Sequence, residues 1–399
     1  MTPVLNNLGG YSLDELHQLY RADLFEYYLP YVDRHIYDGK YGGFLCHIER
    51  NGHHPTANKR TWYDGRGIWV YASLYHELLP DPVYLERAIQ TLDFMMSFKS
   101  SSYPYWPWGY SQTGEPLDDQ QADIYGGLFV AEGMAALAKA TNEDDYWHDA
   151  RMILKGCIEE YDHPRYEYVP HFKTGERLNA PRVLGHWMIM LNLAGHLLDY
   201  KEDEFLQTIS DRCIDALLND HYQTHFDLMI EYLHHDFAVP ETPLDQFAYL
   251  GHGIEVLWMV MAEAQRRQDQ DLWNRASYLF KRHVEVAWDD VHGGIFHELT
   301  HVDNHAFLLD KVLWAQEEVL VGLMMLIEAE NDPWAIRWFN KVYPYVRKKF
   351  ILHDHPDQLW VNGGDRQMKV NHQVDRFENY HHPRHLIKNI RALERMTRK

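Results

Sequence analysis

The connectors between the helical segments of this chain alternate in length. Twelve segments show helical periodicity; the connectors after the second, fourth, sixth, eighth and tenth are a few residues long, whereas those after the odd-numbered segments are long. Because an antiparallel helix pair leaves at one end and returns at the other, this alternation gathers every long loop, and the N-terminus of every even-numbered helix, onto one rim. Long loops inside a compact fold usually carry function. We therefore expect the reactive side chains on that rim.

The helical segments can be placed from their start signals and their apolar spacing. Ser12 followed by Glu15 forms a capping box, and an apolar stripe runs from Leu13 to Tyr28, so the first helix begins near Ser12. The other segments are expected at residues 60–78, 82–99, 121–140, 143–160, 182–199, 203–219, 248–266, 270–287, 309–328, 332–350 and 383–397.

Two all-helical architectures fit this pattern, an open solenoid and a closed barrel of six helical hairpins. A solenoid should show a near-constant repeat and a distinct cap, whereas the spacing here varies. The even-numbered helices are also apolar around their circumference, as in residues 258–262 and 320–326, which is typical of an inner ring covered by an outer one. No Pro/Ser-rich linker or charge block divides the chain. We predict an all-α, twelve-helix (α/α)6 barrel that forms one domain over residues 1–399.

The composition limits the kinds of partner that the protein is expected to bind and indicates the compartment in which it is expected. A formal net charge of −21 argues against nucleic acid and anionic membranes as partners, because phosphate binding needs clustered Lys and Arg. The longest apolar stretch, Val319–Ile327, is far too short to cross a bilayer. Three widely spaced cysteines and an N-terminus without signal-peptide features indicate a cytoplasmic protein. Aromatic residues in polar loops, as at 103–108, suit either a stacked sugar or ordinary loop anchoring.

Three of the even-numbered helix starts carry side chains suited to acid–base chemistry. In the second helix, Arg66 either donates to a substrate oxygen that becomes negative or forms a surface pair with Asp64. In the eighth, His252 and Glu255 share a face at i, i+3 spacing, so Glu255 is expected to accept a proton from one ring nitrogen and raise the basicity of the other. His381 stands at the start of the twelfth helix. Structural roles are the alternative, since the chain has 27 histidines.

The remaining candidates belong to the wall of a binding site. His186 opens the sixth helix, and Trp314 and Glu318 share one face of the tenth, where a ring could stack on a sugar and a carboxylate could accept its hydroxyl. Core packing is the alternative for Trp314, and Tyr125 in the fourth helix and Trp69 in the second are further candidates for the wall. HExxH, Walker A, GxSxG and GxGxxG motifs are absent, which disfavours metal, phosphoryl-transfer, α/β-hydrolase and dinucleotide chemistry.

Five stretches, in register along most of the chain, resemble the signature regions of the N-acylglucosamine 2-epimerase superfamily, which also contains cellobiose 2-epimerases and mannose isomerases. The resemblance implies an (α/α)6 barrel and metal-independent, cofactor-free chemistry at C2 of a sugar. It places the superfamily's two acid–base histidines on His252 and His381 and its anion-facing arginine on Arg66. A further histidine, found in the disaccharide epimerases and isomerases, falls on His186. The stretches are Asp64–Trp69, Asp123–Phe129, Gly251-His252-Gly253-Ile254-Glu255, Lys311–Glu318 and Tyr380-His381-His382-Pro383-Arg384.

Departures from the family pattern leave the substrate open. Leu313-Trp314 stands where two consecutive tryptophans are common, Glu378-Asn379 replaces a Lys-Gly pair, and Leu250 replaces a proline. N-acetylglucosamine, mannose, glucose and disaccharides are all candidate sugars, and a homodimer is one candidate assembly.

Chemistry at C2 gives the rim residues definite roles. The adjacent carbonyl acidifies the C2 proton of an open-chain aldose, and removal of this proton gives an enediolate that needs a base and a stabilised oxyanion. We predict that His252 and His381 flank C2, with Glu255 orienting His252 and Arg66 facing the developing charge. The alternative within the superfamily is a mannose or glucose aldose–ketose isomerase, which can use one base on one face.

Two other classes of function fit the same barrel. A glycoside hydrolase needs two carboxyl groups roughly 5–10 Å apart across the scissile bond. A non-catalytic sugar-binding protein would keep the aromatic residues without the histidine pair. Only an epimerase or isomerase exchanges the C2 proton with solvent. The candidate carboxylates of a hydrolase are Asp64, Asp245, Glu255 and Glu318.

Overall fold

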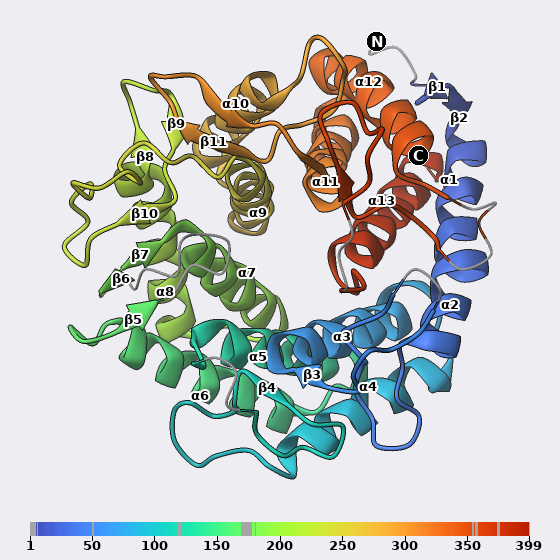
Figure 1. Ribbon diagram of the computed structural model, residues 1–399, viewed down its shortest axis with the longest axis vertical. Coiled ribbons are helices and arrows are strands. Elements are labelled where there is room, and N and C mark those ends of the chain that lie inside the picture. The colour runs from blue at the N-terminus through green and yellow to red at the C-terminus, as the bar shows by residue number, and fades with distance from the viewer. Residues whose placement is uncertain are drawn as a thin grey trace.

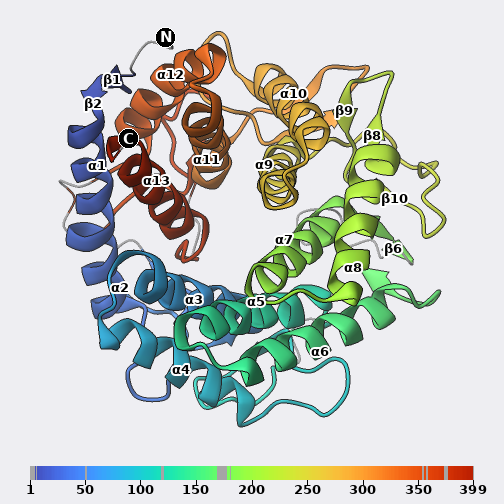
Figure 2. The same cartoon turned by 180° about the vertical axis from the view of Figure 1, so that it is seen from behind.

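The helices form two concentric rings around a common centre (Figure 1). The inner ring consists of α3, α5, α7, α9, α11 and α13, and the outer ring covers it (Figures 1 and 2). The computed structural model describes residues 5, 7–49, 52–117, 121–168, 178–179, 181–352, 355, 358–372 and 376–398.

The inner helices begin on the face seen in Figure 1 and run away from it. Their bounds are Thr61–Ser73 for α3, continued by the π-helical turn η2 at Leu74–Leu78, Ile124–Thr141 for α5, Leu184–Tyr200 for α7, Leu250–Arg267 for α9, Leu313–Glu330 for α11 and His381–Thr397 for α13.

The outer helices run back toward that face. The first is a continuous helix made of α1, the π-helical η1 and α2, and it begins at the capping box of Ser12 and Glu15 that the sequence predicts. The bounds are Leu13–Ala22 for α1, Asp23–Tyr28 for η1, Leu29–His35 for α2, Pro82–Met96 for α4, Asp144–Tyr161 for α6, Glu204–Asp215 for α8 with η3 at Ala216–His221, Gln270–Ala287 for α10 and Pro333–Lys349 for α12.

Contacts between neighbouring inner helices close the ring. Each inner helix packs against the next, and α13 packs against α3, so the described helices form the predicted twelve-helix (α/α)6 barrel. Close approach is possible because Gly65 on α3 faces α5, where a Cβ atom would lie 2.6 Å from the backbone of Phe129. The inner helix α11 is buried around most of its circumference, whereas the outer helix α10 buries one face, as expected for an inner and an outer ring.

The long connectors carry short antiparallel strand pairs on the rim where the inner helices begin. Three of these pairs join one long connector to the next: β3 with β4, β7 with β10, and β13 with β14. Since β3, β7 and β13 lead directly into α3, α7 and α11, the pairing fixes where those helices start. The strand bounds are Asn7–Leu8 (β1), Tyr11–Ser12 (β2), Lys59–Arg60 (β3), Gly109–Tyr110 (β4), Glu167–Tyr168 (β5), Leu178–Asn179 (β6), Arg182–Val183 (β7), Tyr222–Gln223 (β8), Leu228–Met229 (β9), Tyr232–Leu233 (β10), Glu298–His301 (β11), Ala306–Leu308 (β12), Lys311–Val312 (β13) and Gly363–Gly364 (β14).

Buried ion pairs anchor two of these strands. The ammonium group of Lys59, two residues before α3, lies 2.8 Å from the carboxylate of Asp38. The ammonium group of Lys311, two residues before α11, lies 2.8 Å from the carboxylate of Asp289. Each lysine therefore ties the start of an inner helix to the preceding long connector. Among the described residues, no helix is long and apolar enough to cross a membrane.

Candidate active site

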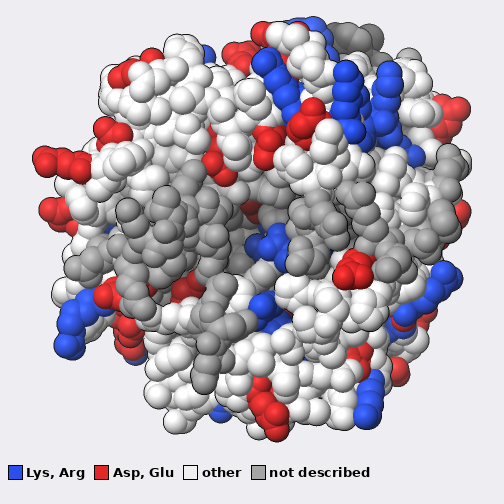
Figure 3. Space-filling view, viewed as in Figure 1, with Lys and Arg blue, Asp and Glu red and all other residues white. Residues whose placement is uncertain are grey.

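The rim encloses a cavity of about 220 Å³ at the N-termini of the inner helices. The space-filling view shows a hollow at the centre of this face, with basic side chains inside it (Figure 3). Both aromatic and charged side chains line it, which suits a small polar ligand with apolar faces. The lining residues are Trp62, Arg66, Trp108, Asp123, Tyr125, Phe129, Tyr168, Met188, Tyr249, His252, Glu255, Trp314, Arg376 and His381.

His252, in the first turn of α9, is held by Glu231 rather than by Glu255. Its Nδ1 lies 3.0 Å from Oε1 of Glu231, a buried carboxylate between β9 and β10. The prediction that Glu255 accepts this proton is wrong, because Glu255 points across the barrel to Arg384 on α13. Burial lowers the pKa of His252, but the charge of Glu231 and its hydrogen bond outweigh burial, so the pKa of His252 is raised above its usual value.

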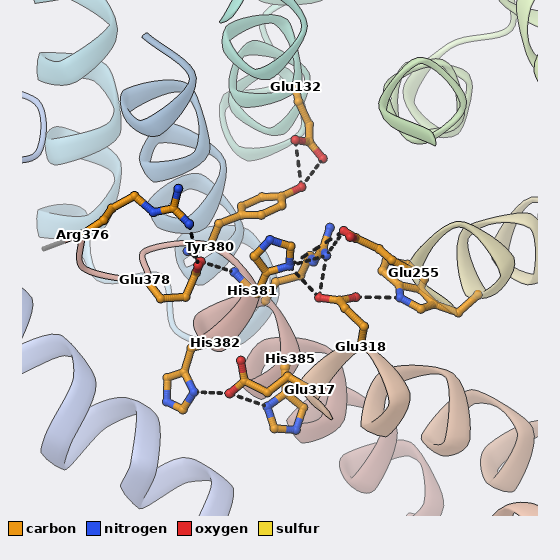
Figure 4. A network of polar contacts seen from close by, with 12 residues as sticks. Glu132, Glu255, Glu317, Glu318, Arg376, Glu378, Tyr380, His381, His382 and His385 are labelled. Atoms are coloured by element: carbon orange, nitrogen blue, oxygen red, sulfur yellow. Dashed lines mark hydrogen bonds and ion pairs between the residues drawn. The ribbon is translucent and has the colours of Figure 1, made fainter. Parts of the chain in front are cut away.

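His381, the first residue of α13, is held by a second buried carboxylate. Its Nδ1 lies 2.8 Å from Oε1 of Glu318, which also accepts hydrogen bonds from Arg384 and Trp258 at 2.7 Å each (Figure 4). Burial alone would raise the pKa of Glu318, but Arg384 and His381 hold it well below its usual value. Glu318 lies behind His381 and does not line the cavity, contrary to the predicted contact with a sugar hydroxyl.

The backbone at the start of α13 is fixed by a further carboxylate. Oε1 of Glu378 accepts the N–H groups of Tyr380 at 2.9 Å and of His381 at 2.8 Å. Acceptors at this position satisfy N–H groups that have no partner inside the helix. Glu378 therefore sets the position of the His381 ring relative to the cavity.

Arg66 extends from α3 into the cavity between aromatic rings. Its guanidinium lies 4.1 Å from the ring centre of Phe129, 4.8 Å from Tyr380 and 4.9 Å from Trp62. It makes no ion pair with any residue that the structure describes. The alternative surface pair with Asp64 is wrong, because Asp64 is buried on another side of α3 and accepts the N–H of Phe44 and the hydroxyl of Tyr110.

The predicted wall residues divide into two groups. Tyr125 and Trp314 line the cavity. His186 does not, because its ring is fully buried between tyrosines, 4.5 Å from the ring centre of Tyr125 and 4.8 Å from that of Tyr168. Trp69 is also buried and does not line the cavity, and its ring stacks on that of His196 with 6.2 Å between the ring centres.

The arrangement can be compared with known proteins. Residues 42–383 match the family described as N-acylglucosamine 2-epimerase (GlcNAc 2-epimerase). The chain belongs to this family. The N-acylglucosamine 2-epimerase of Bos taurus is 25% identical over 354 residues, which cover 84% of this chain and 81% of the relative.

Solved structures show the same fold. The cellobiose 2-epimerase from Bacillus thermoamylovorans B4167 matches with a TM-score of 0.80 at 17% identity, over 94% of this chain and 99% of the other. A D-mannose isomerase matches with a TM-score of 0.76 at 15% identity, over 97% of each chain. Family membership makes the protein a carbohydrate epimerase or isomerase, which confirms the resemblance seen in the sequence.

Three residues that organise this family member's site were not found from the sequence. Arg384 had a usable signal, since it follows His381 by three residues on one helix face. Glu231 had a weaker one, because it is a single charged residue within the apolar run Leu228–Leu233. Glu378 was noticed only as a departure from the family pattern, and its capping role needs the backbone of α13.

Two sets of donor atoms in the described chain have metal-like spacing. Glu255, Glu318 and His381 form one, and Glu317, His382 and His385 form the other. In the first set Arg384 contacts both carboxylates and supplies the positive charge that a cation would bring.

Proposed function

We propose that this enzyme interconverts the C2 epimers of an aldose of the N-acylglucosamine type. The observation that carries the proposal is that two imidazoles, His252 and His381, line one cavity and each is held at Nδ1 by a buried carboxylate. A carboxylate at Nδ1 fixes the tautomer in which Nδ1 carries the proton, so Nε2 is the basic nitrogen. Each ring therefore presents one nitrogen for proton transfer.

The reaction follows from these groups. The Nε2 atom of one histidine removes the C2 proton of the open-chain sugar, and the electron pair of the C–H bond forms the C1–C2 double bond. The carbonyl oxygen becomes an oxyanion, which the Arg66 guanidinium stabilises. The other histidine, protonated, returns a proton to the opposite face of C2. The carbonyl re-forms, and no cofactor enters the balance.

The spacing of the two histidines suits a sugar between them. The ring centre of Trp314 lies 5.9 Å from that of His252 and 5.2 Å from that of His381. The two ring centres are thus at most about 11 Å apart, a range that includes the separation at which one carbon lies about 3–3.5 Å from a nitrogen of each ring. The cavity, at about 220 Å³, is smaller than the roughly 300–1,000 Å³ of typical drug-sized pockets and suits a single sugar.

Glu231, Glu318 and Glu378 are positioning residues in this mechanism. Glu231 favours the protonated ring of His252, so its loss should lower the pKa of that ring. Glu318 and Glu378 fix the His381 side chain and backbone, respectively.

The glycoside hydrolase alternative is not favoured. Asp64 and Glu318 are buried away from the cavity, and Asp245 is not among its lining residues. Glu255 does line it, but its carboxylate is bound by Arg384. The four candidates therefore do not supply two free carboxyl groups across a substrate bond.

We also propose a cytoplasmic enzyme with one catalytic domain over residues 1–399. The three cysteines, Cys46, Cys157 and Cys213, are buried free thiols, which fits a reducing compartment. The sequence has no Pro/Ser-rich linker or charge block that would separate two domains, which supports a single domain.

Proton exchange tests the proposal directly. The enzyme is incubated with N-acetylglucosamine, N-acetylmannosamine, glucose and mannose in D₂O, and C2 deuteration and epimer formation are followed by NMR. We expect deuterium at C2 together with the second epimer. A ketose product would indicate an isomerase instead, and hydrolysis of glycosides without C2 exchange would contradict the proposal.

The pH profile tests the role of Glu231. Glu231→Gln should shift the acid limb of kcat/KM to lower pH, because the amide no longer favours protonated His252, and should lower kcat by about 10²-fold or more. Glu241→Gln, at an exposed position of the same connector, is the matched control. An unchanged acid limb in Glu231→Gln would remove His252 from the proton-transfer step.

A further inference from the structure

Two guanidinium groups line the same cavity and contact one indole. Arg66 and Arg376 both line the cavity, and each guanidinium lies 4.9 Å from the ring centre of Trp62. The two groups are therefore no more than about 10 Å apart, and the aromatic ring offsets only part of their charge. The chemistry at C2 uses one such group.

Among the described residues, the ion pairs of these two arginines supply only one carboxylate. Within the described part of the chain, Arg376 forms one ion pair, with Glu378 at 4.0 Å, and its side chain is 41% exposed (Figure 4). Glu378 already accepts the N–H groups of Tyr380 and His381. Arg66 has no ion pair among the described residues, so Glu378 is the shared counter-charge of two cations.

The other carboxylates around the cavity have different partners. Glu255 is bound by Arg384, and Glu231 by His252. Asp123 accepts the N–H of Tyr125 at the start of α5. None of these carboxylates forms an ion pair with Arg66 or Arg376 among the described residues.

The two arginines occupy different positions relative to the histidines. Arg66 packs on Tyr380, the residue before His381, and its charge acts on His252. Arg376 contacts Trp62 from the connector that leads into α13, and its charge is not among those that shift the pKa of His252. Because the proposed mechanism uses Arg66 at the reacting end of the sugar, Arg376 is left for a part of the ligand away from C1 and C2.

We propose that the sugar carries an acidic substituent away from C2, a carboxylate, phosphate or sulfate group, which Arg376 binds. This inference rests on the proposed function. A guanidinium binds such oxygens through paired, charge-assisted hydrogen bonds. With a net charge of −21 the molecule repels anions at long range, so an anionic sugar needs a local cation in the cavity. Such a ligand also supplies the counter-charge that Glu378 only partly provides.

The test compares acidic and neutral sugars with the same ring. C2 deuteration in D₂O is measured for a hexuronic acid, a hexose 6-phosphate, a hexose 6-sulfate, the parent hexose and an N-acetylhexosamine. We expect kcat/KM to be about 10- to 100-fold higher for at least one acidic sugar than for its neutral parent. Which acid is preferred distinguishes the carboxylate, phosphate and sulfate sources.

Variants at Arg376 assign the preference to this residue. Arg376→Gln should remove the acidic-to-neutral preference, mainly through a rise in KM for the acidic sugar, and Arg376→Lys should restore part of it. Arg395→Gln, which removes one charge at a distant ion pair with Glu328, is the control and should keep the preference. Equal or better turnover of neutral sugars by the unmodified enzyme would overturn the inference and leave the proposed function standing. Absence of C2 exchange with every sugar would reject the proposed function itself.

Discussion

Helices α11 and α13 make two glutamate–histidine pairs that lie back to back. Glu318 pairs with His381, and Glu317, one residue earlier, pairs with His382, one residue later (Figure 4). The first pair stands beside the cavity. The second faces away from it, where the His382 ring lies 4.5 Å from that of Trp360. The same two residue types on the same two helices thus occupy two different environments.

The difference between the pairs is one arginine. Glu318 accepts a hydrogen bond from Arg384, which keeps the pKa of this carboxyl well below its usual value despite burial. Glu317 has no arginine partner among the described residues, and burial raises its pKa to about 7. Burial likewise lowers the pKa of His382 to about 4. Neighbouring charge, rather than residue type, decides which of the two carboxyls has the lower pKa.

The largest expected effect separates the two histidines by activity. His381→Asn should lower kcat/KM by about 10²- to 10⁴-fold, because it removes one of the two acid–base groups. The fold should persist, since Glu318 keeps its bonds to Arg384 and Trp258. His382→Asn is the matched control and should keep activity within about 10-fold, with a stability loss of about 1–3 kcal/mol. C2 exchange rates measure the activity of the two variants, and denaturant unfolding measures their stability. Equal activity losses in the two variants would contradict the assignment.

Removal of Arg384, which contacts the pair of Glu318 and His381 beside the cavity, should destabilise the folded protein. Arg384→Met leaves Glu255 and Glu318 buried without their shared cation, and the expected loss is about 3–5 kcal/mol in the free energy of unfolding. Arg395→Met, at an exposed pair, should cost no more than about 1 kcal/mol. Urea unfolding of both variants checks this. A similar, small loss in each would mean that Arg384 is not what keeps Glu318 ionised.

The pair of Glu317 and His382, which faces away from the cavity and is called the outward pair below, should make the stability of the protein depend on pH. The Glu317 carboxyl keeps its proton up to about pH 7 in the folded chain, whereas its ordinary pKa is 4.5. At this carboxyl the folded state therefore binds more protons between these values, a contribution that lowers stability by up to about 3 kcal/mol as the pH rises through them. The lowered pKa of His382 contributes with the opposite sign over a similar range. Glu317→Gln removes only the first contribution, so its stability should rise relative to that of the unmodified protein as the pH increases. Unfolding curves from about pH 4.5 to pH 8 measure it, and equal slopes in both proteins would contradict the raised pKa.

Much of the fold followed from local signals. Ser12 and Glu15 marked the first helix correctly because a capping box is a contact between near neighbours. Connector lengths gave the barrel and its rim, since they fix which helix ends lie together. The start of α13 at His381, rather than at Pro383, was missed because Glu378 extends the helix by accepting two N–H groups.

Site residues could be predicted from the sequence where they lie at the start of one helix. Their partners could not be predicted where the contact joins separate elements across the barrel. His252 and His381 were found at helix starts. The partner of His252 was not, because i, i+3 spacing favoured Glu255, whereas Glu231 approaches from a connector whose path depends on strand pairing. Arg384 joins Glu255 on α9 to Glu318 on α11, and no spacing within one helix shows such a link.

The smallest predicted effect concerns the far end of the outward pair. The hydroxyl of Tyr20 lies 3.1 Å from Nε2 of His385, whose Nδ1 lies 3.6 Å from Glu317. Tyr20→Phe removes two buried hydrogen bonds, the one with His385 and the one that Asn389 donates, and should cost about 1–2 kcal/mol in the free energy of unfolding. C2 exchange should stay unchanged, because the hydroxyl of Tyr20 bonds to His385 and Asn389 and, among the described residues, not to His381. If Tyr20→Phe instead lowered kcat, the two pairs would be coupled through α13, and the separation of a reactive pair from a structural one would be wrong.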